Sequence, residues 1–421
     1  MPHSLPGWLA FIEGKHPHTI ALGLERVKVV SRMLKQAKVC PVILVGGTNG
    51  KGSICAMLER ILLCAGYRVA VYSSPHILRY NERVRVNGAA VSDSDLCRGF
   101  ALVEAARAEV PLTYFEYGTL AAWEVFSESN PDVIILEVGL GGRLDAVNIY
   151  EPDCAVVSTV DLDHMDFLGK DREKIGYEKA GIYRSGKPAV CGDLMPPSTL
   201  LQHVESIGAE LKLMGRDFGF VRQEQQWQFW SWVGKRSGLA HPALRGSIQM
   251  NNASIVLATL DAMREMLPVA MQDVRRGLME VKLPGRFQVI PGKPAVVLDV
   301  AHNPQAATVL ARSLGDMAFH PNTWAVFGIM ADKDMPNVIR AIKSRVSRWL
   351  VCGLENPRAA SAEMLEKLLI DEGITDPILK FPAASQAFTH ALEAAGEDDR
   401  ILVFGSFFTV ADVMPALASK V

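Results

Sequence analysis

The chain has 421 residues, more than a single hydrophobic core usually serves, so two domains are expected. Hydrophobic residues make up 49% of it and charged residues 21%, a balance typical of globular proteins. The net charge of −2 gives no electrostatic basis for nucleic-acid binding. There is no C-x-x-C pair, no signal-peptide pattern and no apolar run of the ~18 residues that a membrane span needs. We therefore expect a cytoplasmic protein without nucleic-acid or membrane partners, and a monomer by default.

The first motif along the chain is a candidate phosphate-binding loop. Two helices are expected at 7–14 and 23–38, followed by a buried strand at 42–45 and a helix at 53–65. Between that strand and helix stands G-G-T-N-G-K-G, whose glycines allow backbone N–H groups to surround phosphate oxygens. In this interpretation the lysine neutralises the phosphates, and a serine or threonine hydroxyl reaches Mg²⁺; the candidates are Lys51, Ser53 and Thr48.

The spacing of this loop differs from the usual P-loop pattern. Gly46 and Gly50 enclose one residue fewer, and Gly52 separates Lys51 from Ser53. A glycine-rich turn that only happens to contain a lysine is the alternative. The flanking strand and helix favour phosphate binding.

Polar residues gather where later strands end. The next segments are expected to form a strand, a small hairpin or mobile loop, two helices, two strands and a helix: 68–73, 77–91, 94–109, 117–129, 133–136, 154–158 and 171–183. Residues 73–76 follow a strand at its carboxyl end, where open α/β sheets bind ligands. Asp161, Asp163, His164 and Asp166 follow another and form a candidate cation site.

A break at L-P-G-R-F (283–287) separates two domains, which we place at 1–288 and 289–421. Before it, alternating aromatic and polar residues at 205–250 indicate a β-rich segment, and Asn251-Asn252 would cap a helix at 251–266. Beyond it, strands and helices alternate as in a smaller, doubly wound α/β domain: 295–300, 304–315, 323–329, 335–345, 348–353, 361–371, 383–395, 400–405 and 408–417.

With these pieces placed, the chain resembles the Mur ligase superfamily of ATP-dependent amide-forming ligases along essentially its whole length. Within that superfamily it is most similar to the folylpolyglutamate synthase family, in the bifunctional type that also makes dihydrofolate. The motifs that carry the resemblance are G-T-N-G-K-G-S (47–53), Y-S-S-P-H (72–76), F-E (115–116), E-V-G-L-G-G-R-L-D-A-V-N (137–148), D-H-M (163–165), E-K-A-G-I (178–182), L-P-G-R-F (283–287), D-V-A-H-N-P (299–304) and F-G-S-F (404–407). The resemblance implies a P-loop ATPase domain followed by a Rossmann-like C-terminal domain.

The resemblance also implies residue roles around ATP and two Mg²⁺ ions. The residues implied to bind ATP are Asn49, Gly50, Lys51, Gly52, Ser53, Asn252, Arg286 and Asp299. The implied metal ligands are Ser74, Glu137, His164 and Lys179. The implied catalytic residues are Lys51, His164, Lys179 and His302. Lys179 matches a lysine that family members carry as a carbamate, because an ammonium would repel Mg²⁺ whereas a carbamate is an oxygen ligand.

Two substrate sites are implied in the same way. The pterin or folate is expected against Thr19, Ile20, Ala21, Thr113, Tyr114, Phe115, Glu116, Leu144, Asp145 and Ala146. Phe115 would stack on the pterin, and Asp145 would accept its hydrogen bonds. Glutamate is expected at His302 and Ser406. The chain departs from the family at Ala21, where many members carry Asp.

The implied reaction joins L-glutamate to dihydropteroate or to reduced folates. A substrate carboxylate takes the γ-phosphate of ATP, and the amine of glutamate displaces phosphate from the acyl phosphate. His302 is the candidate acceptor of the amine proton, and closure of the second domain is expected to exclude water. Three alternatives remain open: a monofunctional folylpolyglutamate synthase, a muramyl-peptide ligase and a nucleotide switch without ligase activity. Several residues also have structural interpretations, with Glu137 in a salt bridge, Lys179 an ordinary helix lysine and Ser406 a helix cap.

Overall fold

The computed structural model describes residues 1–16 and 20–418, which form two compact units. The first unit comprises residues 1–243 and 250–281, and the second comprises 244–249 and the chain from 282 onward. The division thus falls before the boundary expected after residue 288, and a short segment ahead of it also belongs to the second unit.

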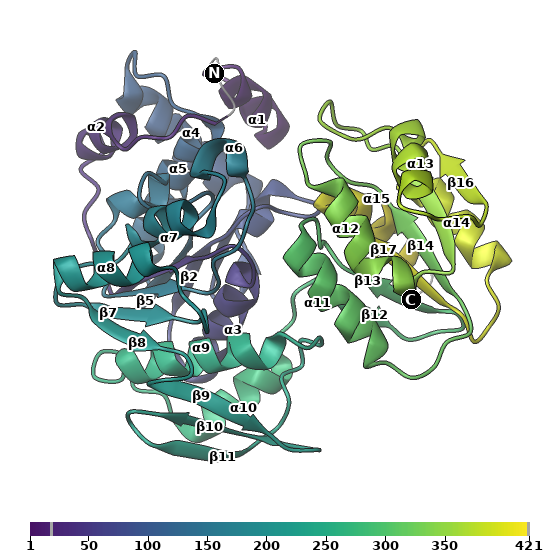
Figure 1. Ribbon diagram of the computed structural model, residues 1–421. Coiled ribbons are helices and arrows are strands. Elements are labelled where there is room, and N and C mark those ends of the chain that lie inside the picture. Colours follow the sequence, from purple (N-terminus) through teal and green to yellow (C-terminus); the bar gives the residue numbers. More distant parts are fainter. Residues whose placement is uncertain (17–19, 419–421) are drawn as a thin grey trace. The chain divides into compact units, whose positions relative to one another are not determined.

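The first unit is built around an eight-stranded sheet whose strand order is β4-β3-β2-β5-β1-β6-β7-β8 (Figure 1). The strands from β2 to β8 in this order are parallel, and β3 and β4 form the expected small hairpin, antiparallel to β2. The strands are β1 (Val42–Gly46), β2 (Val69–Tyr72), β3 (Val84–Val86), β4 (Ala89–Ala90), β5 (Val133–Glu137), β6 (Cys154–Val157), β7 (Pro188–Cys191) and β8 (Glu210–Leu213).

Helices cover both faces of this sheet because its central strands are apolar on both sides (Figure 1). Alternate residues such as Val42 and Leu44 face a core formed with α1 (Leu5–Glu13), α2 (Glu25–Met33), α4 (Asp93–Arg107), α5 (Tyr114–Ser129), α7 (Arg172–Ala180) and α8 (Ser198–Ile207). Helices α3 (Lys51–Cys64), α9 (Gln249–Ala262) and α10 (Met271–Glu280) lie on the other face (Figure 1). The short elements are α6 (Met165–Leu168) and the 3-10 helices η1 (Tyr80–Arg83) and η2 (Ala146–Ile149).

The aromatic segment after β8 forms the β-rich structure that its alternating pattern predicts. Strands β9 (Phe218–Arg222), β10 (Trp227–Ser231) and β11 (Lys235–Leu239) make a separate antiparallel sheet in the order β11-β10-β9. The aromatic side chains of Phe218, Trp227 and Phe229 in this sheet are fully buried. Sheet packing explains the pattern, so no base-stacking surface is needed.

The second unit is a doubly wound α/β domain, as its alternating elements predict. Its sheet has the order β12-β13-β17-β14-β15-β16, parallel except for β12. The strands are β12 (Gln288–Ile290), β13 (Ala295–Leu298), β14 (Thr323–Phe327), β15 (Arg348–Cys352), β16 (Ile378–Phe381) and β17 (Arg400–Phe404). The helices are α11 (Pro304–Gly315), α12 (Met335–Ile342), α13 (Ala362–Asp371), α14 (Ala384–Ala394) and α15 (Phe407–Ala418), with the 3-10 helix η3 (Lys343–Arg345).

One expected helix cap is wrong. Helix α9 begins at Gln249, so Asn251 and Asn252 lie inside its first turns rather than before it. Asn252 is 2% exposed and lies against the phosphate loop, where a Cβ on Gly50 would come within 2.6 Å of its Oδ1 atom. Its burial therefore reflects packing on the loop and not a capping role.

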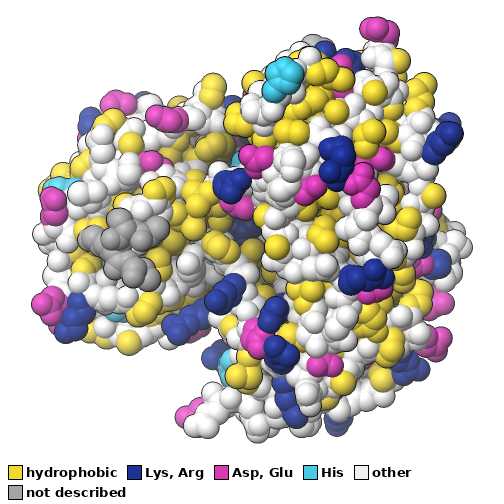
Figure 2. All heavy atoms as spheres, turned by 180° about the vertical axis from the view of Figure 1, so that it is seen from behind, with side chains coloured by type: hydrophobic (Ala, Val, Ile, Leu, Met, Phe, Trp, Pro, Cys, Tyr) yellow, Lys and Arg dark blue, Asp and Glu magenta, His cyan; other side chains and the backbone are white. Residues whose placement is uncertain are grey.

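The charges on the surface are mixed and the cysteines are unpaired, as the composition of the chain predicts. Figure 2 shows acidic and basic side chains interspersed on the face that it presents. All seven cysteines are free thiols, and four of them are buried. No helix in the described part of the chain is long and apolar enough to cross a membrane.

Candidate active site

The register of the first sheet gathers the candidate residues at one edge. Val45 of β1 pairs with Glu137 of β5, and Tyr72 of β2 pairs with Leu136 of the same strand. Gly46 pairs with Val157 at the end of β6. The loops that follow these parallel strands therefore begin side by side, as expected where open α/β sheets bind ligands.

The phosphate loop requires glycine at two positions. Gly47 has φ 133°, and a Cβ there would overlap the hydroxyl of Ser158. Gly50 has φ 90° and, as noted, lies too close to Asn252 to carry a side chain. Both are backbone conformations that other residues rarely adopt. The glycines are thus used for a close turn, which is what a phosphate cradle needs.

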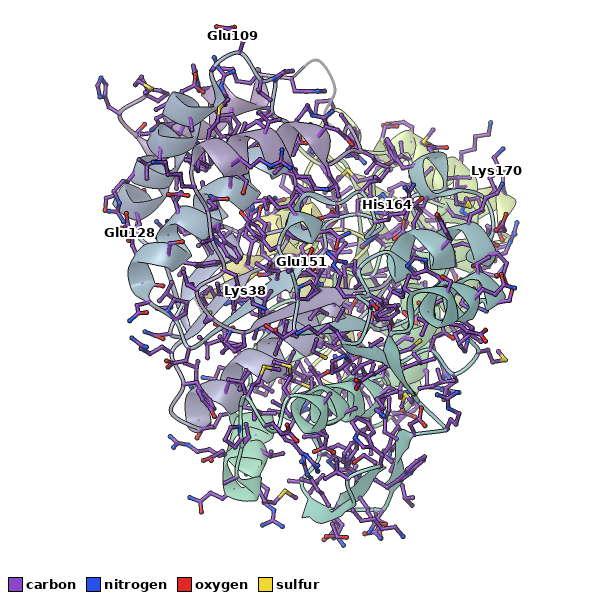
Figure 3. The ribbon with its side chains drawn as sticks, turned by 90° about the vertical axis from the view of Figure 1, so that its left-hand side faces the viewer. Lys38, Glu109, Glu128, Glu151, His164 and Lys170 are labelled. Atoms are coloured by element: carbon purple, nitrogen blue, oxygen red, sulfur yellow. The ribbon has the colours of Figure 1, made fainter. Side chains whose placement is uncertain are left out.

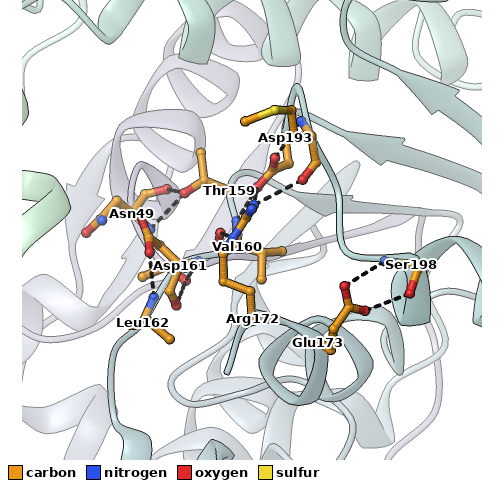
Figure 4. A network of polar contacts seen from close by, with 11 residues as sticks. Asn49, Thr159, Val160, Asp161, Leu162, Arg172, Glu173, Asp193 and Ser198 are labelled. Atoms are coloured by element: carbon orange, nitrogen blue, oxygen red, sulfur yellow. Dashed lines mark hydrogen bonds and ion pairs between the residues drawn. The ribbon is translucent and has the colours of Figure 1, made fainter. Parts of the chain in front are cut away.

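The loop is braced by the segment that follows β6 (Figure 4). The Thr48 N–H donates to the Thr159 carbonyl at 2.8 Å, and the Thr48 hydroxyl bonds both the N–H and the carbonyl of Asp161 at 3.0 and 3.1 Å. Ser158 Oγ donates to the Asn49 carbonyl at 2.6 Å. The Thr48 hydroxyl is therefore committed to the fold, which weakens its candidacy as a Mg²⁺ ligand.

Lys51 and Ser53 lie in the first turn of α3, which begins two residues earlier than expected. Lys51 Nζ lies over the loop and donates to the carbonyls of Gly47 and Thr48 at 3.0 and 3.2 Å. Gly52 and Ser53 are in the same first turn, whose backbone N–H groups lack partners within the helix. A cation and the amide dipoles of a helix N-terminus thus converge on the loop, an arrangement that binds phosphate.

Ser74 and Glu137 meet beside this loop. Glu137 is 4% exposed at the end of β5, and its Oε2 atom accepts from the Ser74 backbone N–H at 3.3 Å. A buried carboxylate next to a serine hydroxyl supplies the hard oxygen donors that Mg²⁺ prefers. This donor set fits a magnesium ion.

The cation site expected from Asp161, Asp163, His164 and Asp166 does not form. In residues 1–16 and 20–418, no three His, Cys, Asp or Glu side chains come together in a way that could hold a metal ion. The carboxylates instead bind their own backbone: Asp161 accepts from the Leu162 N–H, and Asp163 from the His164 N–H. His164, labelled in Figure 3, has φ 51° and precedes α6, with its Nε2 atom 3.9 Å from Asp163 Oδ1.

Lys179 is a buried lysine with a strongly altered pKa. Its side chain is in α7 and is 4% exposed. Burial and the charge of Lys51 lower its pKa to about 7, against the opposing carboxylates of Asp163 and Asp145. Much of this lysine is therefore a neutral amine near pH 7, the form that reacts with CO₂.

Three segments expected to bind the pterin are joined by hydrogen bonds, two of them through one arginine. Arg26 of α2 donates to the carbonyl of Ala21 at 2.7 Å and to both carboxylate oxygens of Glu116 at 3.0 and 3.3 Å. The Gly23 N–H reaches the Leu144 carbonyl at 3.4 Å. Glu116 and Thr113 also form the capping box of α5. This helix begins three residues earlier than expected. Thr19 is outside the described residues, and Ile20 is half-buried beside Ala21.

Phe115 and Asp145 are placed by the turn after β5. The Phe115 ring lies against Gly139, where a Cβ would come within 2.7 Å of it, and its centroid is 5.7 Å from that of Tyr72. Asp145 accepts from the Leu140 and Val147 N–H groups at 2.8 and 3.1 Å. It is the N-cap residue of η2, whose first residue is Ala146. Burial raises the pKa of Asp145 to about 7 despite these donors. These backbone hydrogen bonds occupy part of the accepting capacity of the Asp145 oxygens.

The sequence interpretation missed Arg83. Its Nε atom donates to His76 Nδ1 at 2.8 Å, and its guanidinium lies 5.2 and 5.7 Å from the ring centroids of Tyr80 and Tyr114. Within the described ranges it forms no ion pair with a carboxylate. Its carbonyl accepts from the Ser73 N–H at 2.9 Å, so this half-buried cation lies next to the Ser74 turn. No sequence signal distinguishes it from the surrounding basic residues.

The second unit gathers its candidates where β13 and β17 end. Asp299 accepts from the Phe287 and Ala301 N–H groups at 2.8 and 2.7 Å, and burial raises its pKa. Arg286 and His302 oppose that rise through their charges, so both lie near the carboxylate. Ser406 caps α15, its Oγ atom accepting from the N–H groups of Phe408 and Thr409 at 2.9 and 3.4 Å. The capping interpretation of Ser406 is therefore confirmed as one of its roles.

Both units match domains of the Mur ligases. The Mur ligase middle domain matches residues 45–260, and the Mur ligase glutamate ligase domain matches residues 285–407. The dihydrofolate synthase/folylpolyglutamate synthase of Escherichia coli (strain K12) is 43% identical over 417 residues, which cover 99% of this chain and 96% of that protein.

Solved structures are similar along the whole chain. A structure of E. coli FolC in complex with DHPP and ADP matches with a TM-score of 0.94 and 43% identity, covering 100% of both chains. A bifunctional folylpolyglutamate synthase/dihydrofolate synthase with Mn, AMPPNP and L-glutamate bound matches with a TM-score of 0.91 and 42% identity, covering 99% of this chain and 98% of that one. The chain belongs to the dihydrofolate synthase/folylpolyglutamate synthase family of Mur ligases.

Proposed function

We propose that this protein is an ATP-dependent ligase that joins L-glutamate to dihydropteroate and to the γ-carboxylate of reduced folates. The observation that carries the proposal is the single sheet edge at which the phosphate loop, Glu137, Ser74 and the buried Lys179 meet the aromatic segment at 113–116. The bifunctional names of relatives more than 40% identical favour it over a folylpolyglutamate synthase without dihydrofolate synthase activity.

ATP and a divalent cation are the proposed partners of the phosphate loop. Solved relatives carry ADP, or AMPPNP with Mn, which supports this assignment. Lys51 and the first-turn amides of α3 bind the phosphates, together with Asn49, Gly50, Gly52 and Ser53. Ser74 and Glu137 would hold a first Mg²⁺, and His164 with a carbamylated Lys179 would hold a second. Bound there, the cations would neutralise negative charge on the transferred phosphate.

Lys179 is proposed to act as a carbamate. Its lowered pKa leaves a neutral Nζ lone pair to attack CO₂, and the proton lost from nitrogen goes to solvent. The product carries two oxygens in place of an ammonium, so a cationic group becomes an anionic ligand. Burial at 4% exposure protects this group from hydrolysis and exchange.

The acceptor is proposed to bind at the segments joined by the Arg26 and Gly23 hydrogen bonds. Phe115, packed against Gly139, stacks on the pterin, with Ile20, Ala21, Leu144 and Ala146 around it and Asp145 accepting its N–H groups. Thr113, Tyr114 and Glu116 shape the same wall, and Thr19 is proposed on sequence grounds alone. Arg83, a cation on Tyr80 and Tyr114 that has no carboxylate partner in the described part of the chain, lies where it can attract a carboxylate.

The chemistry has two balanced steps. A carboxylate oxygen of the acceptor attacks the γ-phosphorus, the bond to the β-phosphate oxygen breaks, and ADP leaves. Lys51 offsets the charge that develops on the phosphoryl oxygens. The glutamate nitrogen then attacks the acyl carbon, the carbon–oxygen bond to phosphate breaks, and an amide forms.

The amine step is assigned to the second unit. His302 Nδ1 lies 2.9 Å from the Val300 carbonyl, which can only accept, so a neutral ring carries its proton on Nδ1 and is basic at Nε2. Nε2 accepts the proton that the glutamate amine loses. Ser406 contributes its hydroxyl to glutamate, and Arg286 and Asp299 bind the phosphate and ribose of ATP.

An acceptor comparison tests this function. ADP formation and amide product are measured with ATP, Mg²⁺ and glutamate, using dihydropteroate in one assay and tetrahydrofolate in the other. Glutamate-dependent product is expected with both acceptors. Product with tetrahydrofolate alone would assign the monofunctional activity, and no product with either would refute the proposal.

A further inference from the structure

Phe407 occupies a position between two groups of the second unit that the proposed function uses separately. The Arg286 guanidinium carbon is 4.9 Å from the centroid of the Phe407 ring. The His302 ring is 6.3 Å from the same centroid and tilted by 51°. One aromatic ring thus contacts both the residue assigned to ATP phosphate and the residue assigned to glutamate.

The backbone around Phe407 is fixed by its neighbours. Gly405 has φ 109°, and a Cβ there would come within 2.5 Å of the Gly328 carbonyl, so the chain turns tightly at the end of β17. Ser406 then caps α15, and Phe407 is the first residue of that helix. The ring is therefore carried by a rigid strand-to-helix turn rather than by a free loop.

Asp299 fixes the backbones of the same two partners. One carboxylate oxygen accepts from the N–H of Phe287, which follows Arg286. The other accepts from the N–H of Ala301, which precedes His302. Asp299 thus fixes the backbone beside both partners, and the Val300 carbonyl lies 2.9 Å from His302 Nδ1. A long arginine and an imidazole gain rotamer freedom when side-chain contacts are lost. The Phe407 ring is a side-chain contact that the two partners share.

We propose that Phe407 is a positioning residue that sets the side-chain directions of Arg286 and His302 together. The face of the ring attracts the guanidinium, and its edge limits rotation of the imidazole. Recognition of the nucleotide phosphate and of glutamate then depends on one side chain that acts through these two residues. This inference rests on the proposed function, which assigns Arg286 to ATP and His302 to glutamate.

The test compares Phe407→Leu, Phe407→Tyr and the matched control Phe408→Leu. Leucine keeps apolar volume but removes the ring, tyrosine keeps the ring, and Phe408 is the next residue in the same helix, 48% exposed. Phe407→Leu is expected to raise KM for ATP and KM for glutamate each by about tenfold. Phe407→Tyr and Phe408→Leu are expected to stay within about twofold of wild type, and all variants to keep the melting temperature within a few degrees, ~2–4 °C.

Binding of AMPPNP and of glutamate, measured by calorimetry on the same proteins, separates this inference from the proposed function. If wild type makes no product, the proposed function fails, while weaker AMPPNP binding by Phe407→Leu alone still supports the positioning role. Unchanged AMPPNP and glutamate binding in Phe407→Leu overturns the inference. An equal loss of binding in Phe407→Tyr also overturns the inference, because the aromatic ring would then not be what matters.

Discussion

At the scale of single residues, Lys51 is both a structural and a functional group. Its Nζ atom lies over the phosphate loop on two carbonyls, where it can exchange those partners for phosphate oxygens without leaving α3. Charge-assisted bonds to phosphate are stronger than bonds to neutral carbonyls, so the exchange is favourable.

Replacing Lys51 with alanine should lower kcat for ATP-dependent phosphate release by about 100- to 1000-fold, because the charge on the transferred group loses its counter-cation. The fall in kcat is measured as the rate of acceptor-dependent phosphate release. Lys170→Ala is the control, since Lys170 is an exposed lysine before α7 and should leave the rate unchanged. Near-normal turnover in Lys51→Ala would contradict the assignment of the loop.

Lys179 offers a chemical test. Lys179→Ala should be inactive, and millimolar acetate or formate should restore part of the rate by placing a carboxylate where the carbamate stood. Lys174→Ala, an exposed lysine in the same helix, should behave as wild type without any added acid. Loss of activity without rescue would leave Lys179 important but would argue against the carbamate.

The pKa of Lys179 also predicts a pH dependence of stability. It is about 7 in the folded protein and 10.5 ordinarily, so between these values the unfolded chain binds more protons. The contribution of Lys179 to stability then rises with pH across this window. Lys179→Met, which carries no proton, should be the more stable protein at pH 7, with an advantage that shrinks toward pH 10. Melting curves in EDTA and CO₂-free buffer test this, and an advantage independent of pH would contradict it.

At the scale of elements, a buried ion pair ties the phosphate-loop helix to the hairpin. Arg85 of β3 bonds Glu59 of α3 through Nε and Nη2 at 2.8 to 3.1 Å, and its Nη1 atom donates to Ser73 Oγ at 3.0 Å. The two side chains are 19% and 9% exposed. Arg85 thus links α3 to the turn that carries Ser74, the proposed magnesium ligand.

Glu59→Gln should destabilise the protein by about 3 kcal/mol, because it leaves a buried arginine without its counter-charge. Glu59→Met combined with Arg85→Met should cost less than Glu59→Gln alone, since no unpaired charge remains. Glu128→Gln breaks the exposed pair with Arg98 and should cost under ~1 kcal/mol. Urea unfolding measures all three variants. Equal losses for Glu59→Gln and Glu128→Gln would show that the inner pair does not hold α3 to the hairpin.

Elements with a strong local signal could be predicted from the sequence, and weak ones could not. The phosphate loop, β5 and the alternating second unit follow from apolar runs and glycine turns. Strand β16 (Ile378–Phe381) is half-exposed at the sheet edge, so its short pattern carries no periodic signal. The cap expected at Asn251 and Asn252 was wrong because packing on Gly50 sets the identity of Asn252. Local propensity cannot report such a tertiary constraint.

In the candidate site, too, some residues could be predicted from the sequence and others could not. Residues that belong to contiguous motifs, such as Lys51 and Glu137, could be named from the sequence. Arg26 could not, because its partner Glu116 is 90 positions away in the chain. Arg83 is marked only by lacking a carboxylate partner among the described residues, a property that needs coordinates. Lys179 could be placed by family resemblance, but its burial and lowered pKa are structural facts.

At the scale of the whole molecule, the proposed reaction has two steps: ATP activates an acceptor carboxylate as an acyl phosphate, and glutamate displaces the phosphate. We propose that both units take part, the first with the phosphate loop and the acceptor segments, and the second with Asp299, His302 and Ser406. The same two steps serve dihydropteroate and reduced folates, because only the identity of the carboxylate differs between them.

The most direct test follows oxygen. Dihydropteroate labelled with ¹⁸O in both carboxylate oxygens is turned over with ATP and glutamate, and the released phosphate is analysed by mass spectrometry. Because one carboxylate oxygen becomes the bridge to phosphorus and leaves with it, each phosphate should carry one ¹⁸O, and the other should remain in the amide carbonyl. Unlabelled phosphate accompanying labelled product would contradict the acyl-phosphate route.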